Sequence, residues 1–210
     1  MKLLASIVLV CLLGIGALAH LTQGFSALTA ETARRNDVAA SPRLISDVSV
    51  ITPFNRTRSL HDVLHQDGRV AIVNFIYTRC VTLCLAMGGE YQQLQQAILD
   101  QGLQDKVRLL SISFDPSDSA DRLQRYGHSM KADPAVWEFV TMAPGEERQR
   151  VLDDFGIIVI PAPFDEYEHN AAYHVVTSEP RLGRIVDYGE PLLALAYARQ
   201  ALELQTEAKQ

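Results

Sequence analysis

Two closely spaced cysteines, Cys80 and Cys84, are the residues of this chain best suited to chemistry. They lie in the segment FIYTRCVTLC, residues 75–84, and only one other cysteine occurs in the chain. Two such thiols can form a disulfide, exchange it with another protein, or bind zinc or Cu(I) as thiolates. In a helix, residues four apart have Cβ atoms about 5–6 Å apart, and a disulfide needs ~3.8 Å. We therefore expect a redox or metal-binding pair rather than a structural cross-link.

The segments on either side of the pair predict a strand and a helix. Residues 69–78, RVAIVNFIYT, are a continuous apolar run typical of a strand buried on both faces of a sheet. After Cys84, apolar residues recur at helical spacing and form one stripe: Met87, Tyr91, Leu94 and Ile98. A thiol at the start of such a helix has a lowered pKa, and Arg79 adds a positive charge beside Cys80.

The rest of the chain alternates strands and helices around this unit. We predict strands at residues 48–52, 106–115, 137–142, 173–177 and 184–188, with a turn at 180–183. Helices are predicted at 59–68, 119–130, 146–155 and 191–204. Asp118 is a candidate N-cap, and the last helix has an apolar stripe of Leu192, Leu195, Ala198 and Leu202. The pattern predicts one α/β domain, residues 43–205, a thioredoxin-like sandwich with a mixed central sheet flanked by helices.

The N-terminus predicts export. Lys2 is followed by an apolar run without charged residues from Leu3 to Ala19, and the run closes on Ala-Leu-Ala. This pattern is typical of a signal peptide or an N-terminal membrane anchor over residues 1–19. Residues 20–42 are predicted to be a flexible tether. We expect the domain in the periplasm or at the extracytoplasmic face of the inner membrane. The third cysteine, Cys11, lies in the N-terminal segment, so Cys80 and Cys84 are the cysteines of the domain exposed to this oxidising compartment.

Charge excludes one class of partner. The formal net charge is −6 and the pI is about 5.5. Such a chain lacks the basic surface that binds phosphate backbones, so we expect no nucleic-acid partner.

Three stretches together resemble the Sco/SenC copper-binding proteins of cytochrome c oxidase assembly. They are FIYTRCVTLC, SISFDPSDSADRLQRYG and EHNAAYHVVTSEPRLGRIVDYGE, and the resemblance extends from about Leu44 to Ala201. It implies a thioredoxin fold and a copper site made of Cys80, Cys84 and one distant histidine. By position in the pattern that ligand is His169, and His174 falls inside the following strand as a buried histidine. Asp118 resembles a family carboxylate near the metal loop, an alternative to the N-cap.

The chain also departs from the family pattern. Val81 and Leu85 stand where the family usually has proline after each cysteine. Thr177-Ser178-Glu179-Pro180 replaces the usual Asp-Pro turn, and Gly88-Gly89 interrupts the expected helix. These changes affect the surroundings of the site, and they remove none of the three expected ligands.

Two functions from different classes follow from these residues. The first is a copper chaperone that delivers copper to, or matures the copper site of, a respiratory oxidase, with copper held as Cu(I) or Cu(II) by Cys80, Cys84 and His169. The alternative is a periplasmic thiol–disulfide reductase acting on a client's metal-binding cysteines, in which Cys80 attacks and Cys84 resolves the mixed disulfide. His169 separates the two, because only the chaperone needs it. A thiol peroxidase and a metal-free binding domain are the weaker interpretations.

The expected partners follow from the first hypothesis. They are a respiratory oxidase subunit or another copper protein, and a thiol reductant that keeps Cys80 and Cys84 reduced. The membrane is reached through the N-terminal segment, and we expect a monomer.

Overall fold

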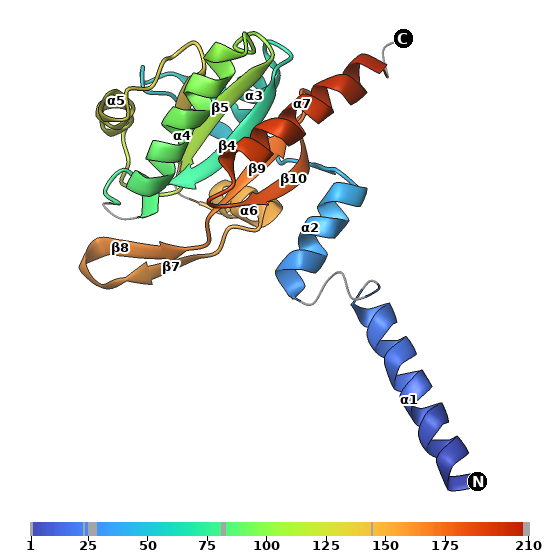
Figure 1. The fold of residues 1–210 in the computed structure, drawn as a ribbon. Helices are drawn as coiled ribbons and strands as arrows, with labels where there is room; N and C mark the ends of the chain where they lie inside the picture. Colours follow the sequence, from blue (N-terminus) through green and yellow to red (C-terminus); the bar gives the residue numbers. More distant parts are fainter. Residues whose placement is uncertain (1, 23, 25–28, 81–82, 144, 208–210) are drawn as a thin grey trace. The chain divides into compact units, whose positions relative to one another are not determined.

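The computed structural model describes residues 2–22, 24, 29–80, 83–143 and 145–207, without the side chains of residues 2, 5, 21 and 83–85. The chain divides into two compact units, Met1–Ser41 and Pro42–Gln210 (Figure 1). The second unit contains the whole sheet and all the predicted site residues.

The first unit consists of two helices, α1 (Lys2–Leu21) and α2 (Ala30–Ala40). Among the described residues, no helix is long and apolar enough to cross a membrane. Helix α2 was not predicted within the segment expected to be a flexible tether. Thr29 caps this helix by accepting a hydrogen bond from the Thr32 backbone N–H, and Glu31 pairs with Arg34 and Arg35 one turn on. Such local contacts form a helix without an apolar stripe. The roles assigned to residues 1–19 and 20–42 stay predictions.

A mixed sheet forms the centre of the second unit. Its order is β1-β10-β9-β4-β5-β6-β2-β3. The strands are β1 (Arg43–Leu44), β2 (Ser49–Ile51), β3 (Thr57–Ser59), β4 (Val70–Ile76), β5 (Val107–Ser113), β6 (Trp137–Met142), β9 (Ala172–Val176) and β10 (Arg181–Asp187). Strands β4, β5 and β6 run parallel, and all other pairings in this sheet are antiparallel. The predicted mixed sheet is therefore confirmed.

Helices cover both faces of the sheet. They are α3 (Leu60–His65), α4 (Leu83–Asp100), α5 (Ala120–Ser129), α6 (Glu146–Phe155) and α7 (Pro191–Glu207). Tyr91 of α4 packs on Tyr173, whereas Phe155 of α6 packs on the next residue, His174. Because neighbouring residues of a strand point to opposite faces, α4 and α6 lie on opposite sides of β9. Figure 1 shows α4 and α7 together in front of the sheet and α6 behind it. This is the predicted sandwich.

Burial explains why the central strands are so apolar. All residues of β4 and β5 are buried, because helices cover both faces of these parallel strands. The predicted stripe of α4 is confirmed, with Met87, Tyr91, Leu94 and Ile98 completely buried. The predicted apolar stripe of α7 wrongly includes Leu192, which is 63% exposed. The buried residues of this helix are Ala194, Leu195 and Ala198. The buried face is centred on small side chains, which a search for large apolar residues misses.

The last hairpin turns earlier than predicted. The turn lies at residues 177–180, where the Thr177 backbone N–H donates to the Arg181 carbonyl. Arg181 already belongs to β10, and Gly183 marks a register shift between Leu182 and Arg184. The glycine that suggested a turn is therefore part of an irregular strand.

A second, small sheet was not predicted as such. β7 (Val159–Ala162) and β8 (Glu166–His169) form an antiparallel hairpin closed by a short 3₁₀ turn, Pro163–Asp165. Pro161 and Pro163 disfavour a strand in the sequence, so β7 was not predicted. The charged EYEH segment has no apolar run, so β8 was not predicted either. This hairpin carries His169 at its end.

The glycine pair in α4 provides a test of close packing. The helix continues through both residues, but a Cβ at Gly88 would lie 2.4 Å from the Met130 sulfur, and one at Gly89 meets nothing within 4 Å. We expect Gly89→Ala to raise the free energy of unfolding by about 0.5–1 kcal/mol, because alanine favours a helix over glycine. Gly88→Ala forces the end of the flexible Met130 side chain to move, so we expect it to be less stable than Gly89→Ala. Urea unfolding of both variants measures this difference, and equal stability would contradict it.

Candidate copper and thiol site

The cysteine loop begins where β4 ends. Cys80 lies in a tight turn in which its backbone N–H donates to the Tyr77 carbonyl at 3.2 Å, and its side chain is 4% exposed. Helix α4 starts at Leu83, so Cys80 precedes the helix and Cys84 belongs to its first turn. The helical spacing assumed for the pair therefore does not apply. Val81 and the side chains of Cys84 and Leu85 lie outside the described part of the structure.

Asp118 anchors this loop. Its carboxylate accepts hydrogen bonds from the Thr78 backbone N–H at 2.8 Å, from the Thr78 hydroxyl at 2.5 Å and from the Ser113 hydroxyl at 2.6 Å. The prediction that Asp118 caps the following helix is wrong, because Ser119 accepts the capping hydrogen bond from the Arg122 N–H. A buried carboxylate needs several donors, and the loop supplies more of them than the helix end does.

Arg79 does not bring an unbalanced positive charge to Cys80. Its guanidinium pairs with the Asp115 carboxylate at 2.8 Å, and the Asp115 side chain is 1% exposed. Burial raises the pKa of Asp115, but hydrogen bonds from Ser117 and Arg79 outweigh it and hold this pKa below its ordinary value. The positive charge is therefore compensated, and the predicted effect of Arg79 on the thiol is weakened.

His169 enters the site from the other side, at the end of β8. Its ring meets Phe114 and Tyr77 edge to face, with centroid distances of 4.9 and 6.2 Å. Burial lowers the pKa of His169, and the Asn170 carbonyl and an electrostatic interaction with Cys80 act in the opposite direction. The imidazole and the Cys80 side chain therefore interact electrostatically, and Tyr77 interacts with both. At neutral pH the imidazole is uncharged, which is the form that binds metals.

Tyr77 connects the two halves of the site. Its hydroxyl donates to the Glu166 carboxylate of β8 at 2.5 Å and lies 3.4 Å from the Tyr167 carbonyl. Burial raises the pKa of Tyr77 far above its ordinary value, with further contributions from Glu166 and from the Cys80 side chain. Sequence reasoning missed Tyr77 and Glu166. The position of Tyr77, three residues before Cys80, could have indicated a role in the site. Nothing in the sequence indicates that it pairs with Glu166.

His174 occupies a different kind of position. It is completely buried in β9, and its ring meets the edges of Phe75 and Phe155 at centroid distances of 5.8 and 5.2 Å. One ring nitrogen lies 3.4 Å from the Val73 carbonyl. This packing agrees with the interpretation of His174 as a core histidine.

Cys80 and His169 are the candidate copper ligands whose side chains the structure describes. A thiol and an imidazole are ligands that suit copper in either oxidation state. Among the side chains that the structure describes, no three His, Cys, Asp or Glu residues group closely enough to hold a metal ion, and Cys84 is not among those side chains. The complete ligand set of Cys80, Cys84 and His169 therefore stays a prediction.

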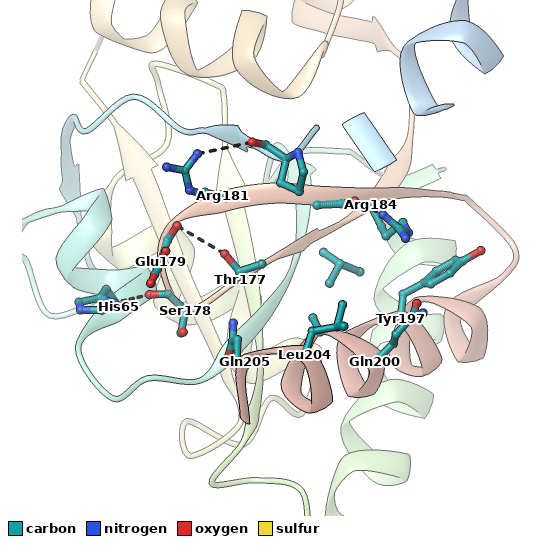
Figure 2. Close-up of a pocket in the computed structure, with 14 residues that line it drawn as sticks. His65, Thr177, Ser178, Glu179, Arg181, Arg184, Tyr197, Gln200, Leu204 and Gln205 are labelled. Atoms are coloured by element: carbon teal, nitrogen blue, oxygen red, sulfur yellow. Dashed lines mark hydrogen bonds between the residues drawn. The ribbon is translucent and has the colours of Figure 1, made fainter. Parts of the chain in front are cut away.

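A separate pocket lies on the other side of the domain. It has a volume of about 530 Å³ and lies between the β9–β10 hairpin and the C-terminal half of α7 (Figure 2). Tyr197 and Leu204 line it, and the Arg184 guanidinium lies 5.4 Å from the centroid of the Tyr197 ring. Its described lining contains none of the candidate site residues.

Comparison with known proteins identifies the family of this chain. A model of the SCO1/SenC family matches residues 53–201. The chain belongs to this family. A curated relative, the SCO1 protein homolog of Bacillus subtilis, is 28% identical over 112 residues, which cover 52% of this chain and 57% of that protein. The chain thus matches a little over half the length of this relative.

Solved structures share the fold. The protein BsSco, described as a member of the Sco family of cytochrome c oxidase assembly proteins with a disulfide switch, superposes with a TM-score of 0.65 at 20% identity; the match covers 77% of this chain and 94% of BsSco. Arabidopsis thaliana ScoI with copper bound gives a TM-score of 0.65 at 15% identity, covering 77% of this chain and 99% of that one. The predicted family and thioredoxin-like fold are confirmed.

The Asp118 anchor can be tested by one isosteric change. Asp118→Asn replaces an acceptor with an NH₂ group that cannot accept, so at least one buried donor of Thr78 or Ser113 loses its partner. We expect the free energy of unfolding to fall by about 1–3 kcal/mol. Asp121→Asn, in the exposed first turn of α5, is the matched control and should cost less than about 1 kcal/mol. Urea unfolding compares the two, and equal losses would argue against the anchor.

The Tyr77 link predicts a change in local dynamics. Tyr77→Phe keeps the ring but removes the hydroxyl that holds Glu166, so the β7–β8 hairpin should open more often. We expect amide hydrogen exchange in β8 to accelerate about tenfold, the equivalent of one lost hydrogen bond to a charged group. Glu166→Gln should give a smaller effect in the same segment. Tyr188→Phe is the control, and unchanged exchange in Tyr77→Phe would contradict the link.

Proposed function

We propose that this chain is a copper chaperone that delivers copper to, or matures the copper site of, a respiratory oxidase. The observation that supports it best is that Cys80 and His169, from distant parts of the sequence, interact electrostatically and that Tyr77 interacts with both. Membership of the SCO1/SenC family and the copper bound to the related ScoI of Arabidopsis thaliana agree with this function.

Each candidate ligand has a distinct task in this proposal. The thiolates of Cys80 and Cys84 bind copper, and two sulfurs suffice for Cu(I) because this soft ion accepts low coordination numbers. His169 adds the nitrogen ligand that Cu(II) prefers. Tyr77, through Glu166, holds the strand that presents His169. Asp118 holds the turn that presents Cys80.

The alternative function is thiol–disulfide exchange with a client's metal-binding cysteines. The disulfide switch described for BsSco favours it. In this reaction the Cys80 thiolate attacks a disulfide of the client and releases one client thiolate. Cys84 then attacks the mixed disulfide, which leaves the client as a dithiol and this chain oxidised. One pair of cysteines can serve both functions. His169 is needed for the first only.

The place of action is part of the proposal. The apolar segment 1–19 supports export or anchoring, so we assign the domain to the extracytoplasmic side of the inner membrane.

Copper titration of the reduced full-length protein in mild detergent tests the proposal. We expect one Cu(I) and one Cu(II) per chain, with both lost in Cys80→Ala and in Cys84→Ala. His169→Ala should weaken Cu(II) binding by about 100-fold or more, because even the loss of a group that orients a metal ligand costs about 10–100-fold in affinity. The same variant should largely spare Cu(I) binding. His174→Gln is the matched control and should leave both affinities unchanged.

The outcomes separate the two functions. Wild-type affinities no tighter than those of Cys80→Ala would overturn the copper function. Reduction of a protein disulfide that needs Cys80 and Cys84 but not His169 would then support thiol exchange. Weakening by His174→Gln instead of His169→Ala would reassign the histidine.

A further inference from the structure

The β7–β8 hairpin is built as a separate projection beside the candidate site. Figure 1 shows it extending away from the main sheet, below the first turns of α4. Hydrogen bonds hold its base and its second strand, β8, whose first residue, Glu166, lies next to the turn. The Asn170 side chain accepts from the Ile158 backbone N–H at 2.7 Å and donates to the Gly156 carbonyl at 2.9 Å. Tyr77 holds β8 through Glu166. The base and β8 are therefore held in place, whereas the Phe164 side chain in the turn extends into solvent.

The projecting part exposes large apolar side chains. Ile158 is 64% exposed, Ile160 is 54% exposed, and Phe164 at the tip is 96% exposed. Pro161 and Pro163 are exposed between them. Single exposed apolar residues are common on protein surfaces, but five within residues 158–164 are typical of a contact surface.

The backbone at the tip is strained in a way that presents this surface. Phe164 and Asp165 both have left-handed backbone angles, with φ of 65° and 59°. A left-handed conformation costs a non-glycine residue on the order of 1 kcal/mol. Within the described chain this strain gains no burial of the Phe164 ring. Contact with another molecule would explain a strained and exposed phenylalanine.

Charge narrows the identity of that molecule. Asp165 and Glu168 are exposed on the hairpin, and residues 157–171 contain no lysine or arginine. An acidic hairpin with an apolar tip complements a surface that combines an apolar hollow with a basic rim. It repels the anionic headgroups of a membrane surface.

The position of the hairpin next to the candidate site indicates which protein it would bind. His169 ends the hairpin and interacts electrostatically with Cys80. Cys80 is only 4% exposed, and Tyr77, three residues before it, is hydrogen-bonded to Glu166 of the hairpin. We propose that Ile158, Ile160 and Phe164 form a docking surface for the client protein, whose matching surface is an apolar hollow rimmed by lysine or arginine. This inference rests on the proposed function, because it assigns the client of that site to a surface.

The test separates docking from chemistry. The probe is the soluble copper-binding domain of the cytochrome c oxidase of the same organism, mixed with the copper-loaded full-length chain in mild detergent. In Ile160→Ser/Phe164→Ser we expect the second-order rate constant of copper transfer to fall at least tenfold. Copper affinity and the reaction of the thiols with a small aromatic disulfide reagent should stay at wild-type values, because neither needs the docking surface. Leu192→Ser, on the 63%-exposed apolar residue of α7, is the matched control and should transfer copper at the wild-type rate.

A charge variant tests the partner's basic rim. Asp165→Lys/Glu168→Lys should lower the same rate constant and flatten its dependence on salt, since charge complementarity acts mainly on association. Transfer at the wild-type rate by Ile160→Ser/Phe164→Ser would overturn the docking surface and leave the copper function intact. A wild-type chain that binds copper but transfers none would overturn delivery, and the docking proposal with it.

Other occupants of the hairpin give different results. If the serine variants change only the sedimentation of the copper-free protein, the surface joins two copies of this chain. If they change only binding to vesicles of phosphatidylglycerol and phosphatidylethanolamine, the hairpin binds lipid. Either result would overturn the client assignment.

Discussion

Burial of β4 on both faces is the constraint on which the rest of the structure depends. The strand pairs in parallel with β5 and antiparallel with β9, and none of its residues reaches solvent. Its backbone and side chains are therefore fixed, and so is the point at which the chain leaves the sheet. Tyr77, Thr78 and Cys80 follow directly from that point. A thiol on a loop gains a defined position because the strand before it has no freedom to move.

Two polar contacts extend this rigidity into the site. Asp118 holds Thr78 and thereby the turn before Cys80, while Tyr77 holds Glu166 and thereby the strand before His169. Both contacts are made by buried or half-buried groups, where an unmade hydrogen bond is costly. The site is therefore positioned by its neighbours, and the departures from the family pattern at Val81 and Leu85 leave these two supports in place.

The β7–β8 hairpin, in contrast to the buried loop supports, exposes a large apolar side chain. Asn170 holds its base and Tyr77 holds the start of β8, but its turn exposes Phe164 on a strained backbone. A core this well packed has no need to expose such a side chain. The contrast between a held strand and an exposed phenylalanine in the turn is the basis of the docking surface that we propose.

Local sequence alone determined most of the elements. Strand 137–142 and helix 146–155 follow from alternating and helical periodicity together with the glycine at 156, and the structure has both with those bounds. The buried stripe of α4 follows in the same way, because each residue's face depends only on its position along one helix. The cysteine pair and its resemblance to a family are also properties of short segments.

Only the tertiary structure decided how distant segments meet. Asp118 is an equally good N-cap or loop anchor by sequence, and the choice depends on Thr78 and Ser113 lying within reach. Leu192 fits an apolar stripe, but the sheet accepts the small face of Ala194 and Ala198 instead. The proximity of His169 to Cys80, and the pairing of Tyr77 with Glu166, arise from contacts across 80 or more intervening positions. Periodicity carries no information about such contacts, because they depend on the packing of the whole sheet.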